Sequence, residues 1–379
     1  MSRRSWVSHG LILAFAFLAA APLTWSSLAT GRASSGRSTA SSSSFNPAPM
    51  LSWIPGANYP SSTVITHVTW GRAMRRRGCG DNLPVTWGAD GRLYTAFGDC
   101  TGFGGEHAST TVARVSDPGD PIDFTGRNLW NIVDRSGPSG RKFSGLISIH
   151  GILYGLLRNA DRDGHEARVG YSTDGGFHWR FASWLLRWGY PTFVNYGRDN
   201  SGAPDANVYI VSPDTSSAYE PSTDPAHRGM ILMRIPANRL LDQGSYAYFK
   251  GFWSGRAHWS VVPAVRKLVF TCPSTLCLRS QISYDAPLRR YLWWHQNWVG
   301  DTHTQMAGGF GLYEAPNLWG PWRTVFFTRD AVADPRFHDG PGDGGSFPTK
   351  WMSRDGKTLY LVCSCEDAFT VRRVVLTTG

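Results

Sequence analysis

Polar side chains recur at a similar distance before a repeated tyrosine in this sequence. The pairs are Asn82 with Tyr94 and Lys142 with Tyr154, 12 residues apart, and Gln281 with Tyr291 and Lys350 with Tyr360, 10 residues apart. Thr192 and Asn195 occupy the corresponding stretch before Tyr209. If the strands that these residues open converge at one end, their amides and amines form a shared polar pocket. The alternative is that they cap exposed strand ends.

One chemistry that such a pocket could perform is elimination from a uronate sugar. That reaction needs cations or amides to neutralise the carboxylate, and a Tyr or His to carry protons. The candidates are Lys142, Arg158, Asn159, Tyr219, Arg228 and Lys350, with His67, His107 and His150 as further proton carriers. A lone His in an aromatic chain is more often structural than catalytic, so the histidines are the weaker part of this prediction.

Hydrolysis of a glycosidic bond is the second chemistry, and it needs two carboxylates that flank the bond. Asp81 is the best single candidate because it opens the first inner strand. Its possible partners are Asp99, Glu106, Asp301 and Glu314, and the sequence does not pair two of them. Trp293, Trp294, Trp298 and Tyr313 could stack on sugar rings in either enzyme. A pocket that binds a glycan or a protein without cleaving anything is the third alternative.

The elements that must position these residues are repeated hairpins. In each repeat a turn precedes a Tyr within a β-branched and aromatic run, which is typical of a hairpin strand. The Tyr residues are Tyr94, Tyr154, Tyr209, Tyr291 and Tyr360, and second strands follow over residues 110–115, 167–172, 230–235, 309–313 and 369–376. Stacked units of this size predict an all-β β-propeller with five recognisable blades. The interval that contains Trp253, Trp259 and residues 261–270 leaves room for a sixth or seventh blade. A β-sandwich is the alternative fold.

A local motif narrows the fold further. Ser172 to Trp179 has the pattern S-x-D-x-G-x-x-W, in which Asp174 can accept backbone N–H bonds and Gly176 can adopt a positive φ. This motif resembles the Asp box of sialidase-like propellers. There the box is structural, which implies that Asp174 clamps a turn and that Trp179 packs beneath it.

The wider pattern resembles a family of secreted bacterial β-propellers of unassigned function. The segments that carry the resemblance are residues 80–87, 191–197, 308–322 and 347–351. That family is similar to the sialidase-like and five-bladed glycoside hydrolases and to the propeller polysaccharide lyases that cut ulvan-type uronates. The resemblance covers about residues 65–377 and implies a polysaccharide or oligosaccharide substrate. Only one good Asp box is present, which departs from the true sialidases.

Residues 1–29 have the features of a secretory signal peptide. Arg3 and Arg4 precede an apolar run over residues 11–21 that is too short to span a bilayer. The opening also resembles a twin-arginine signal, and an ordinary basic segment is the alternative. Residues 30–50 are a Ser-rich segment predicted to be a disordered linker, and residues 51–379 a single domain. We expect a secreted or periplasmic monomer with no stable membrane insertion after signal removal.

Composition excludes several other classes. The 379 residues include 42 Gly, with 13% aromatic and 17% charged residues, which argues against disorder and against coiled coils. The net charge of +10 falls to +8 without the signal peptide, and Arg72 with Arg75–Arg77 supplies half of that. The basic run lacks interleaved aromatics, so no nucleic-acid partner is expected. The positive charge favours an acidic polysaccharide.

The six cysteines fall into three local pairs. In an oxidising compartment Cys79–Cys100 and Cys272–Cys277 are expected to form disulfides that close short loops. A bridge between Cys363 and Cys365 would be strained if the segment is extended. The spacings do not match zinc sites, so neither a metal nor another cofactor is expected.

Overall fold

The computed structural model describes residues 54–379, apart from residues 72–74, 273–275, 299–308, 330–333 and 336–341. These residues belong to one compact unit, Met50–Gly379. The expected signal peptide and linker lie outside the described residues. Within the described part of the chain, no helix has the length and apolarity needed to cross a membrane.

Antiparallel strands make up almost all of the regular structure, which confirms the all-β prediction. The first two meanders are β3 (Cys79–Trp87), β4 (Leu93–Gly102), β5 (Ala108–Ser116) and β6 (Thr125–Ile132), then β7 (Lys142–Ile149), β8 (Ile152–Arg158), β9 (Ala167–Ser172) and β10 (Arg180–Phe181). The third comprises β11 (Thr192–Asn195), β12 (Asn207–Pro213), β13 (Gly229–Pro236), β14 (Ala247–Trp253) and β15 (Arg256–Ser260), with β16 (Leu268–Thr271) beside β13.

Two further meanders complete the described fold. The fourth is β17 (Leu276–Asp285), β18 (Arg290–Trp298), β19 (Phe310–Ala315) and β20 (Arg323–Thr328). The fifth is β21 (Gly342–Ser346), β22 (Thr358–Cys365) and β23 (Phe369–Thr378), joined by β1 (Ile65–Trp70) and β2 (Arg75–Arg77). Short 3-10 helices η1 to η8 span Pro121–Asp123, Gly137–Ser139, Arg198–Asn200, Pro225–His227, Ala237–Arg239, Gln243–Ser245, Pro263–Val265 and Thr349–Trp351.

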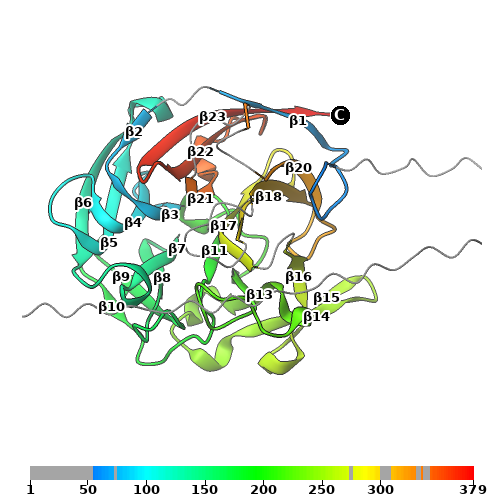
Figure 1. The fold of residues 1–379 in the computed structure, drawn as a ribbon, viewed down its shortest axis with the longest axis horizontal. Helices are drawn as coiled ribbons and strands as arrows, with labels where there is room; N and C mark the ends of the chain where they lie inside the picture. The colour runs from blue at the N-terminus through cyan, green and yellow to red at the C-terminus, as the bar shows by residue number, and fades with distance from the viewer. Residues whose placement is uncertain (1–53, 72–74, 273–275, 299–308, 330–333, 336–341) are drawn as a thin grey trace, which may run out of the picture. The chain divides into compact units, whose positions relative to one another are not determined.

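The first strands of these meanders neighbour one another in a closed cycle. In order they are β3, β7, β11, β17 and β21, and β21 returns to β3. Figure 1 shows them nearest the centre, with the later strands of each meander farther out. The sheets of β11 and β17 are joined by a short parallel pairing, Val194 with Ile282 and Asn195 with Ser283. The starts of β3 and β7 lie together, because Asn82 of β3 accepts a hydrogen bond from Arg158, which lies opposite Lys142 of β7.

Both ends of the described chain contribute to one sheet. β1 pairs antiparallel with β23, so the first strand of the chain completes the sheet formed by the last ones. Figure 1 shows blue β1 beside red β23. Because a strand added from the far end of the sequence holds the cycle shut, its pairing resists opening of the whole fold.

Alternating apolar residues on the strands fill the space between neighbouring sheets. The repeated tyrosines all lie on the second strand of their meanders, β4, β8, β12, β18 and β22, as the repeat predicts. The interval that left room for a further blade instead forms β14, β15 and β16, which extend the third sheet. Its aromatic content follows from that placement, since Phe249 and Phe270 pack into the hydrophobic core between the third and fourth meanders.

The two expected disulfides, Cys79–Cys100 and Cys272–Cys277, are both formed. Cys363 and Cys365 are also bonded, which corrects the expectation against that bridge. Their Cα atoms are 5.2 Å apart. That distance lies within the range that a disulfide spans and is shorter than an ideal extended strand would give.

Candidate functional site

A cluster of polar side chains, most of them buried, occupies the end of the cycle where β3 and β7 begin and β4 and β8 end. Its members are Asp81 and Asn82 from β3, Asp99 from β4, Lys142 from β7, Arg158 from β8, and Asn159 just beyond it. Three of them, Asn82, Asp99 and Asn159, have positive φ angles of 70°, 53° and 55°. Strained backbone of this kind gathers at functional sites.

Arg158 is the centre of the cluster and is fully buried. Its Nη1 donates to Asn159 Oδ1 at 3.1 Å and to the Tyr219 hydroxyl at 2.7 Å, while Nη2 donates to Asn82 Oδ1 at 3.2 Å. The guanidinium also lies over the rings of Tyr190 and Tyr219, at 4.8 and 5.3 Å from their centroids. Burial opposes the charged form, but the nearby tyrosines and Asp81 outweigh it and raise the pKa of Arg158. It therefore stays a cation.

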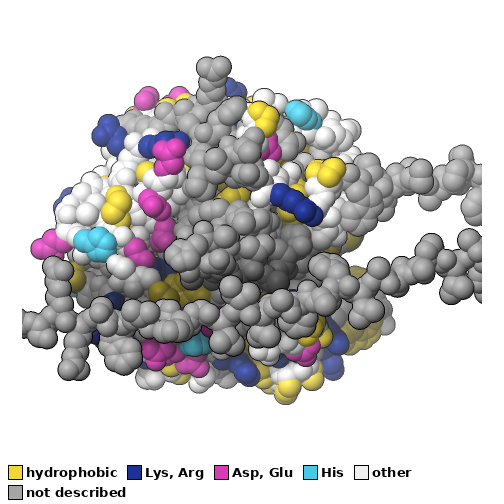
Figure 2. Space-filling view, in the orientation of Figure 1, with side chains coloured by type: hydrophobic (Ala, Val, Ile, Leu, Met, Phe, Trp, Pro, Cys, Tyr) yellow, Lys and Arg dark blue, Asp and Glu magenta, His cyan; other side chains and the backbone are white. Residues whose placement is uncertain are grey.

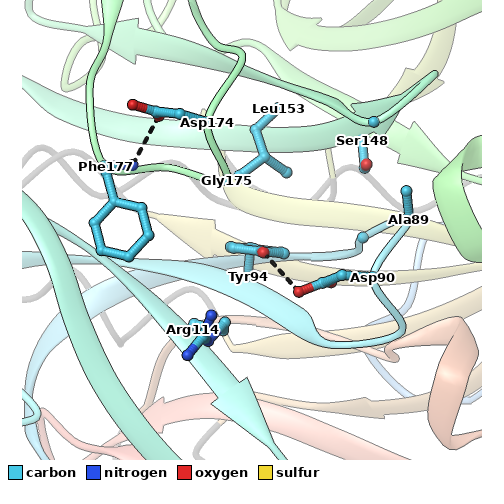
Figure 3. Close-up of a pocket in the computed structure, with 11 residues that line it drawn as sticks. Ala89, Asp90, Tyr94, Arg114, Ser148, Leu153, Asp174, Gly175 and Phe177 are labelled. Atoms are coloured by element: carbon cyan, nitrogen blue, oxygen red, sulfur yellow. Dashed lines mark hydrogen bonds between the residues drawn. The ribbon is translucent and has the colours of Figure 1, made fainter.

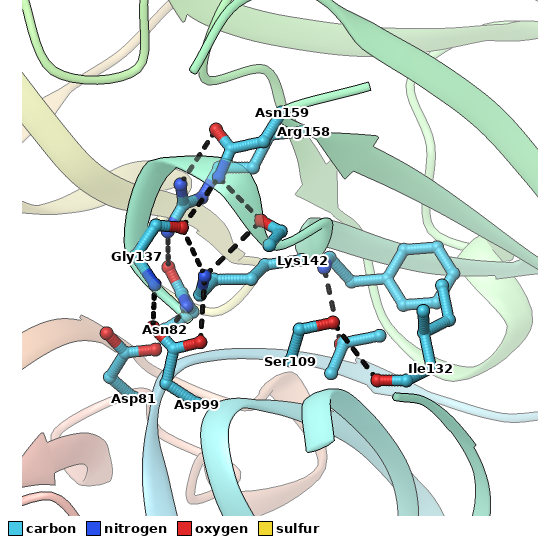
Figure 4. Close-up of polar contacts among 12 residues, drawn as sticks. Asp81, Asn82, Asp99, Ser109, Ile132, Gly137, Lys142, Arg158 and Asn159 are labelled. Atoms are coloured by element: carbon cyan, nitrogen blue, oxygen red, sulfur yellow. Dashed lines mark hydrogen bonds and ion pairs between the residues drawn. The ribbon is translucent and has the colours of Figure 1, made fainter. Parts of the chain in front are cut away.

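Lys142 is a second buried cation, on β7 directly opposite Arg158 of β8. Its Nζ donates to the carbonyls of Gly137 at 2.8 Å and Gly140 at 3.3 Å, and pairs with Asp99 Oδ1 at 2.9 Å. Burial, reinforced by the charge of Arg158, lowers the pKa of Lys142. Figure 4 shows its amine between Asp99 and the Gly137 segment. The three ammonium protons are thus all engaged within the protein.

Tyr219 reaches the cluster from the loop between β12 and β13. Its hydroxyl oxygen lies 2.7 Å from Arg158 Nη1 and 3.2 Å from Asn159 Nδ2, and both groups donate to it. Burial acts to raise the pKa of Tyr219, but the charges of Arg158 and Lys142 and these hydrogen bonds outweigh it, so the pKa lies below its ordinary 10.0. The cluster therefore stabilises the phenolate of a tyrosine that is still partly exposed.

The carboxylates of the site differ in what they contact. Asp81 is partly exposed and its Oδ1 accepts from Asn82 Nδ2 at 2.5 Å. Asp99 pairs with Lys142, and its Oδ2 accepts from Gly137 N at 3.1 Å. Gly98 makes room for the group, because a Cβ there would lie 2.1 Å from Asp81 Oδ1 and 2.4 Å from Asn82 Nδ2.

A small cavity adjoins this cluster at the centre of the cycle. It measures about 10 Å³, with Asn82, Tyr190 and Gln281 in its lining, which is room for about one water molecule. Gln281 also binds both the N–H and the carbonyl of Val85, at 3.2 and 2.9 Å. Asp81, Asp99 and Tyr219 are partly exposed, so the cluster reaches the surface at these side chains.

The other residues predicted for the pocket lie apart from the Arg158 cluster or serve as links between strands. Asn195 donates to Leu146 O at 3.4 Å and Thr192 is buried on β11. Lys350 lies in η8, and its Nζ pairs with Asp117 Oδ2 at 2.5 Å. Arg228 donates to Ser222 O at 3.3 Å. None of these contacts involves Arg158.

The predicted histidines and Trp294 occupy different surroundings. His67 is exposed on β1, and His107 and His150 are exposed in connections between strands. Trp294 is 1% exposed and stacks on Phe310, so it packs in the core and offers no ring face to solvent. Trp293 and Tyr313 are buried likewise. Glu106 is exposed, Glu314 pairs with Arg290, and Asp301 lies outside the described residues.

Asp174 lies at a turn. Its Oδ1 accepts from the backbone N–H of Phe177 at 3.1 Å and His178 at 3.0 Å, and Gly176 there has a φ of 93°. Figure 3 shows Asp174 and Phe177 at a cavity shared with Tyr94 and Asp90. Trp179 packs on Phe143, with ring centroids 4.7 Å apart. These contacts are those of a structural turn.

Tyr190 also contacts this cluster, and it was not among the site residues predicted from the sequence. Its hydroxyl donates to Asn82 Oδ1, and Arg158 lies over its ring. Tyr190 is two residues before Thr192, the residue that the repeat spacing selected. The repeat therefore identified the right segment but not the side chain that contacts Arg158. Among the described residues, no group of three or more His, Cys, Asp or Glu side chains is placed to hold a metal ion.

No family model matches the sequence, and no curated protein matches it. Solved structures that match include a putative hydrolase from Bacteroides ovatus, at 12% identity and a TM-score of 0.48 over 79% of this chain and 87% of that one. A GH43_1 enzyme from Xanthomonas citri matches at 13% identity and 0.44, over 85% and 93%. An α-L-arabinanase from Penicillium chrysogenum, complexed with arabinobiose, matches at 11% and 0.41, over 83% and 98%. Likeness at this level assigns neither a family nor an activity to this chain.

Proposed function

We propose that this protein cleaves an acidic polysaccharide by β-elimination, with Tyr219 as the base. The observation that carries the proposal is the setting of the Tyr219 hydroxyl. It accepts hydrogen bonds from Arg158 and Asn159, and its pKa is lowered although burial alone would raise it. A phenol in this setting loses its proton more readily than one in water, which is what a general base requires.

The elimination balances with the atoms of the sugar and Tyr219 alone. In a uronate the carboxyl group makes the C5 proton acidic, and the Tyr219 phenolate takes that proton. The C5–H electron pair forms a C4=C5 double bond while the C4–O bond breaks, and its electrons leave on the oxygen of the departing chain. The proton carried by Tyr219 is then available to that oxygen. The products are an unsaturated uronate end and a new reducing end.

The buried cations support this step without touching the sugar. Arg158 and Lys142 are 0% and 1% exposed. Arg158 holds the Tyr219 hydroxyl by a hydrogen bond, and the charges of both residues favour its ionised form. Their effect is strong because charges interact more strongly in a buried site than in water. The net charge of +8 that remains without residues 1–29 favours the approach of an acidic polymer.

Glycoside hydrolysis is the second candidate, because Asp81 is partly exposed in the same cluster. Hydrolysis needs a second carboxyl group that can give a proton to the leaving oxygen. Asp99 is the neighbouring carboxylate, and both its oxygens are engaged by Lys142 and Gly137. The described geometry therefore supports elimination better than hydrolysis.

The test is incubation with polygalacturonate, alginate and neutral arabinan, followed by ultraviolet absorbance for unsaturated uronate and by a reducing-end assay. We expect both signals from an acidic polymer, and a loss of about 10²–10⁴-fold in Tyr219→Phe. Tyr171→Phe, on β9 and outside the cluster, is the matched control and keeps full activity. New reducing ends without absorbance would replace elimination by hydrolysis. Neither signal from any polymer would remove the enzymatic proposal.

We also propose that the five meanders are the blades of a five-bladed propeller and that residues 1–29 direct its export. The cyclic order of β3, β7, β11, β17 and β21 supports the first. The basic and apolar pattern of residues 1–29 supports the second. N-terminal sequencing of the protein recovered outside the cytoplasm tests export, with a start near residue 30 expected and an intact Met1 contradicting it.

A further inference from the structure

Exposed hydrophobic side chains concentrate on one edge of the third meander. Among the described residues eight large hydrophobic side chains are exposed, and five of them lie between residues 252 and 265. They are Phe252, Trp253, Val261, Val262 and Val265. The first two end β14 at the turn into β15, and β15 is the outermost strand of its sheet. Figure 1 places this hairpin at the lower right, away from the central strands that hold the Arg158 cluster.

The aromatic rings of this hairpin are fixed in place by stacking. The Trp253 ring lies parallel to His258, with centroids 3.4 Å apart, and the indole remains 44% exposed. Phe252 stacks on Trp319 at 5.9 Å, and Phe249 stacks on Trp319 at the same distance. One side of the Trp253 ring is therefore covered by His258, while the ring still presents area to solvent. A rigid ring of this kind is a platform for the apolar face of a sugar.

The sequence around this hairpin contains basic residues and no acidic ones. Residues 243–284 contain no Asp or Glu, and their cations are Lys250, Arg256, Arg266, Lys267 and Arg279. Lys250 and Arg256 are exposed, and Lys250 Nζ lies 6.0 Å from the centre of the Trp253 ring. Figure 2 shows hydrophobic, basic and acidic side chains along the lower edge of the molecule. Arg266 pairs with Asp214 Oδ1 at 2.5 Å, so Lys250 and Arg256 are the two exposed cations of the hairpin that can pair with a polyanion.

We infer that the β14–β15 hairpin is a second binding site for an acidic polysaccharide, separate from the cluster around Arg158. Trp253 supplies the stacking platform, and Lys250 and Arg256 pair with the carboxylates of the chain. A site of this kind raises the local concentration of polymer at the protein and so assists the Tyr219 site by avidity. The inference rests on the proposed function only for the identity of the polymer, because binding at the hairpin needs no cleavage.

Affinity electrophoresis in gels that contain polygalacturonate tests the inference. We expect retardation of the wild type, and a roughly two- to tenfold weaker affinity in Trp253→Ala, the loss that one aromatic contact gives. Lys250→Ala with Arg256→Ala should weaken binding further, and added salt should do the same. Val133→Ala, an exposed hydrophobic residue outside the hairpin, is the matched control and should leave retardation unchanged. Tyr219→Phe should also be retarded like the wild type.

Several results would overturn the inference. One is an absence of retardation of the wild type, and another is equal retardation of Trp253→Ala and wild type. Loss of retardation in Tyr219→Phe would place the polymer at the Arg158 cluster instead. Trp253-dependent binding to phosphatidylglycerol vesicles in place of polygalacturonate would assign the hairpin to a membrane surface. A Trp253-dependent dimer in gel filtration would assign it to a second copy of the chain. Retardation without any cleavage would support the hairpin site and contradict the proposed elimination.

Discussion

Replacing Asp285 by an asparagine should change how the stability of this protein depends on pH. Asp285 ends β17 and is 0% exposed. Its Oδ1 accepts from Leu288 N at 3.2 Å, and its Oδ2 has no hydrogen-bond partner among the described residues. Burial raises the pKa of Asp285 from 3.8 to about 7, and the charge of Asp355 adds to the rise while the Leu288 N–H opposes it.

The sign and size of the effect follow from the difference in proton affinity between the folded and unfolded chains. Between pH 4 and 7 the folded protein keeps the Asp285 proton that the unfolded chain releases, so the free energy of unfolding falls as pH rises. At about 1.4 kcal/mol for each pKa unit, Asp285 costs the folded state roughly 3 kcal/mol between pH 4.5 and 8. A side-chain amide cannot ionise, so the Asp285→Asn variant should lose this dependence.

Urea unfolding of wild type and Asp285→Asn from pH 4.5 to 8 measures the effect. The free energy of unfolding of the variant, relative to wild type, should increase by roughly 3 kcal/mol over that range. Taking the difference cancels the other titrating groups, and any constant cost of burying the amide drops out. Asn238→Ala, at an exposed position whose side chain does not ionise, is the control and should show a difference that does not change with pH. A constant difference for Asp285→Asn would refute the reasoning.

Three further predictions concern the cluster and the Asp174 turn. Arg158→Met should raise the pKa of Tyr219, because it removes the main opposing charge. It should also cost about 1–3 kcal/mol of stability, because the buried Asn159 Oδ1 loses the Arg158 N–H that donates to it. A phenolate titration and urea unfolding measure the two effects, and an unchanged Tyr219 pKa would contradict the first. Gly98→Ala should displace the Asp81 carboxylate, because the added Cβ would lie 2.1 Å from its Oδ1. Activity in the reducing-end assay should fall, and a wild-type rate would show that the position of this carboxylate does not matter. Asp174→Ala should lower stability by about 1 kcal/mol through its lost turn hydrogen bonds and leave cleavage unchanged; inactive but folded protein would contradict its structural role.

Much of the cluster could be predicted because a repeat places equivalent residues at equivalent positions. Counting back from the tyrosines of β4 and β8 found Asn82 and Lys142, and these lie at the same end of the cycle. Arg158 and Asn159 lie at the end of β8. That end is paired with the start of β7, so it lies at the same end of the cycle as Lys142. The same counting failed for Lys350, because η8 follows β21 there and turns the side chain toward Asp117.

Other features depend on contacts between distant parts of the chain. Tyr190 and Tyr219 come from irregular segments, and only the assembled fold brings both to Arg158. Trp294 could not be distinguished from an exposed platform, since a core tryptophan and a sugar-binding tryptophan have the same sequence neighbours. The bridge between Cys363 and Cys365 depended on a departure from ideal strand geometry that the residue types do not encode.

The central claim is that the cluster lowers the pKa of Tyr219, and one titration tests it without any substrate. Phenolate absorbance of wild type minus that of Tyr219→Phe, followed as pH rises, isolates the ionisation of this one side chain. The account predicts a midpoint below 10.0, because Arg158 and Lys142 favour the phenolate more than burial disfavours it. A midpoint at or above 10.0 would contradict the account and leave the site without its base.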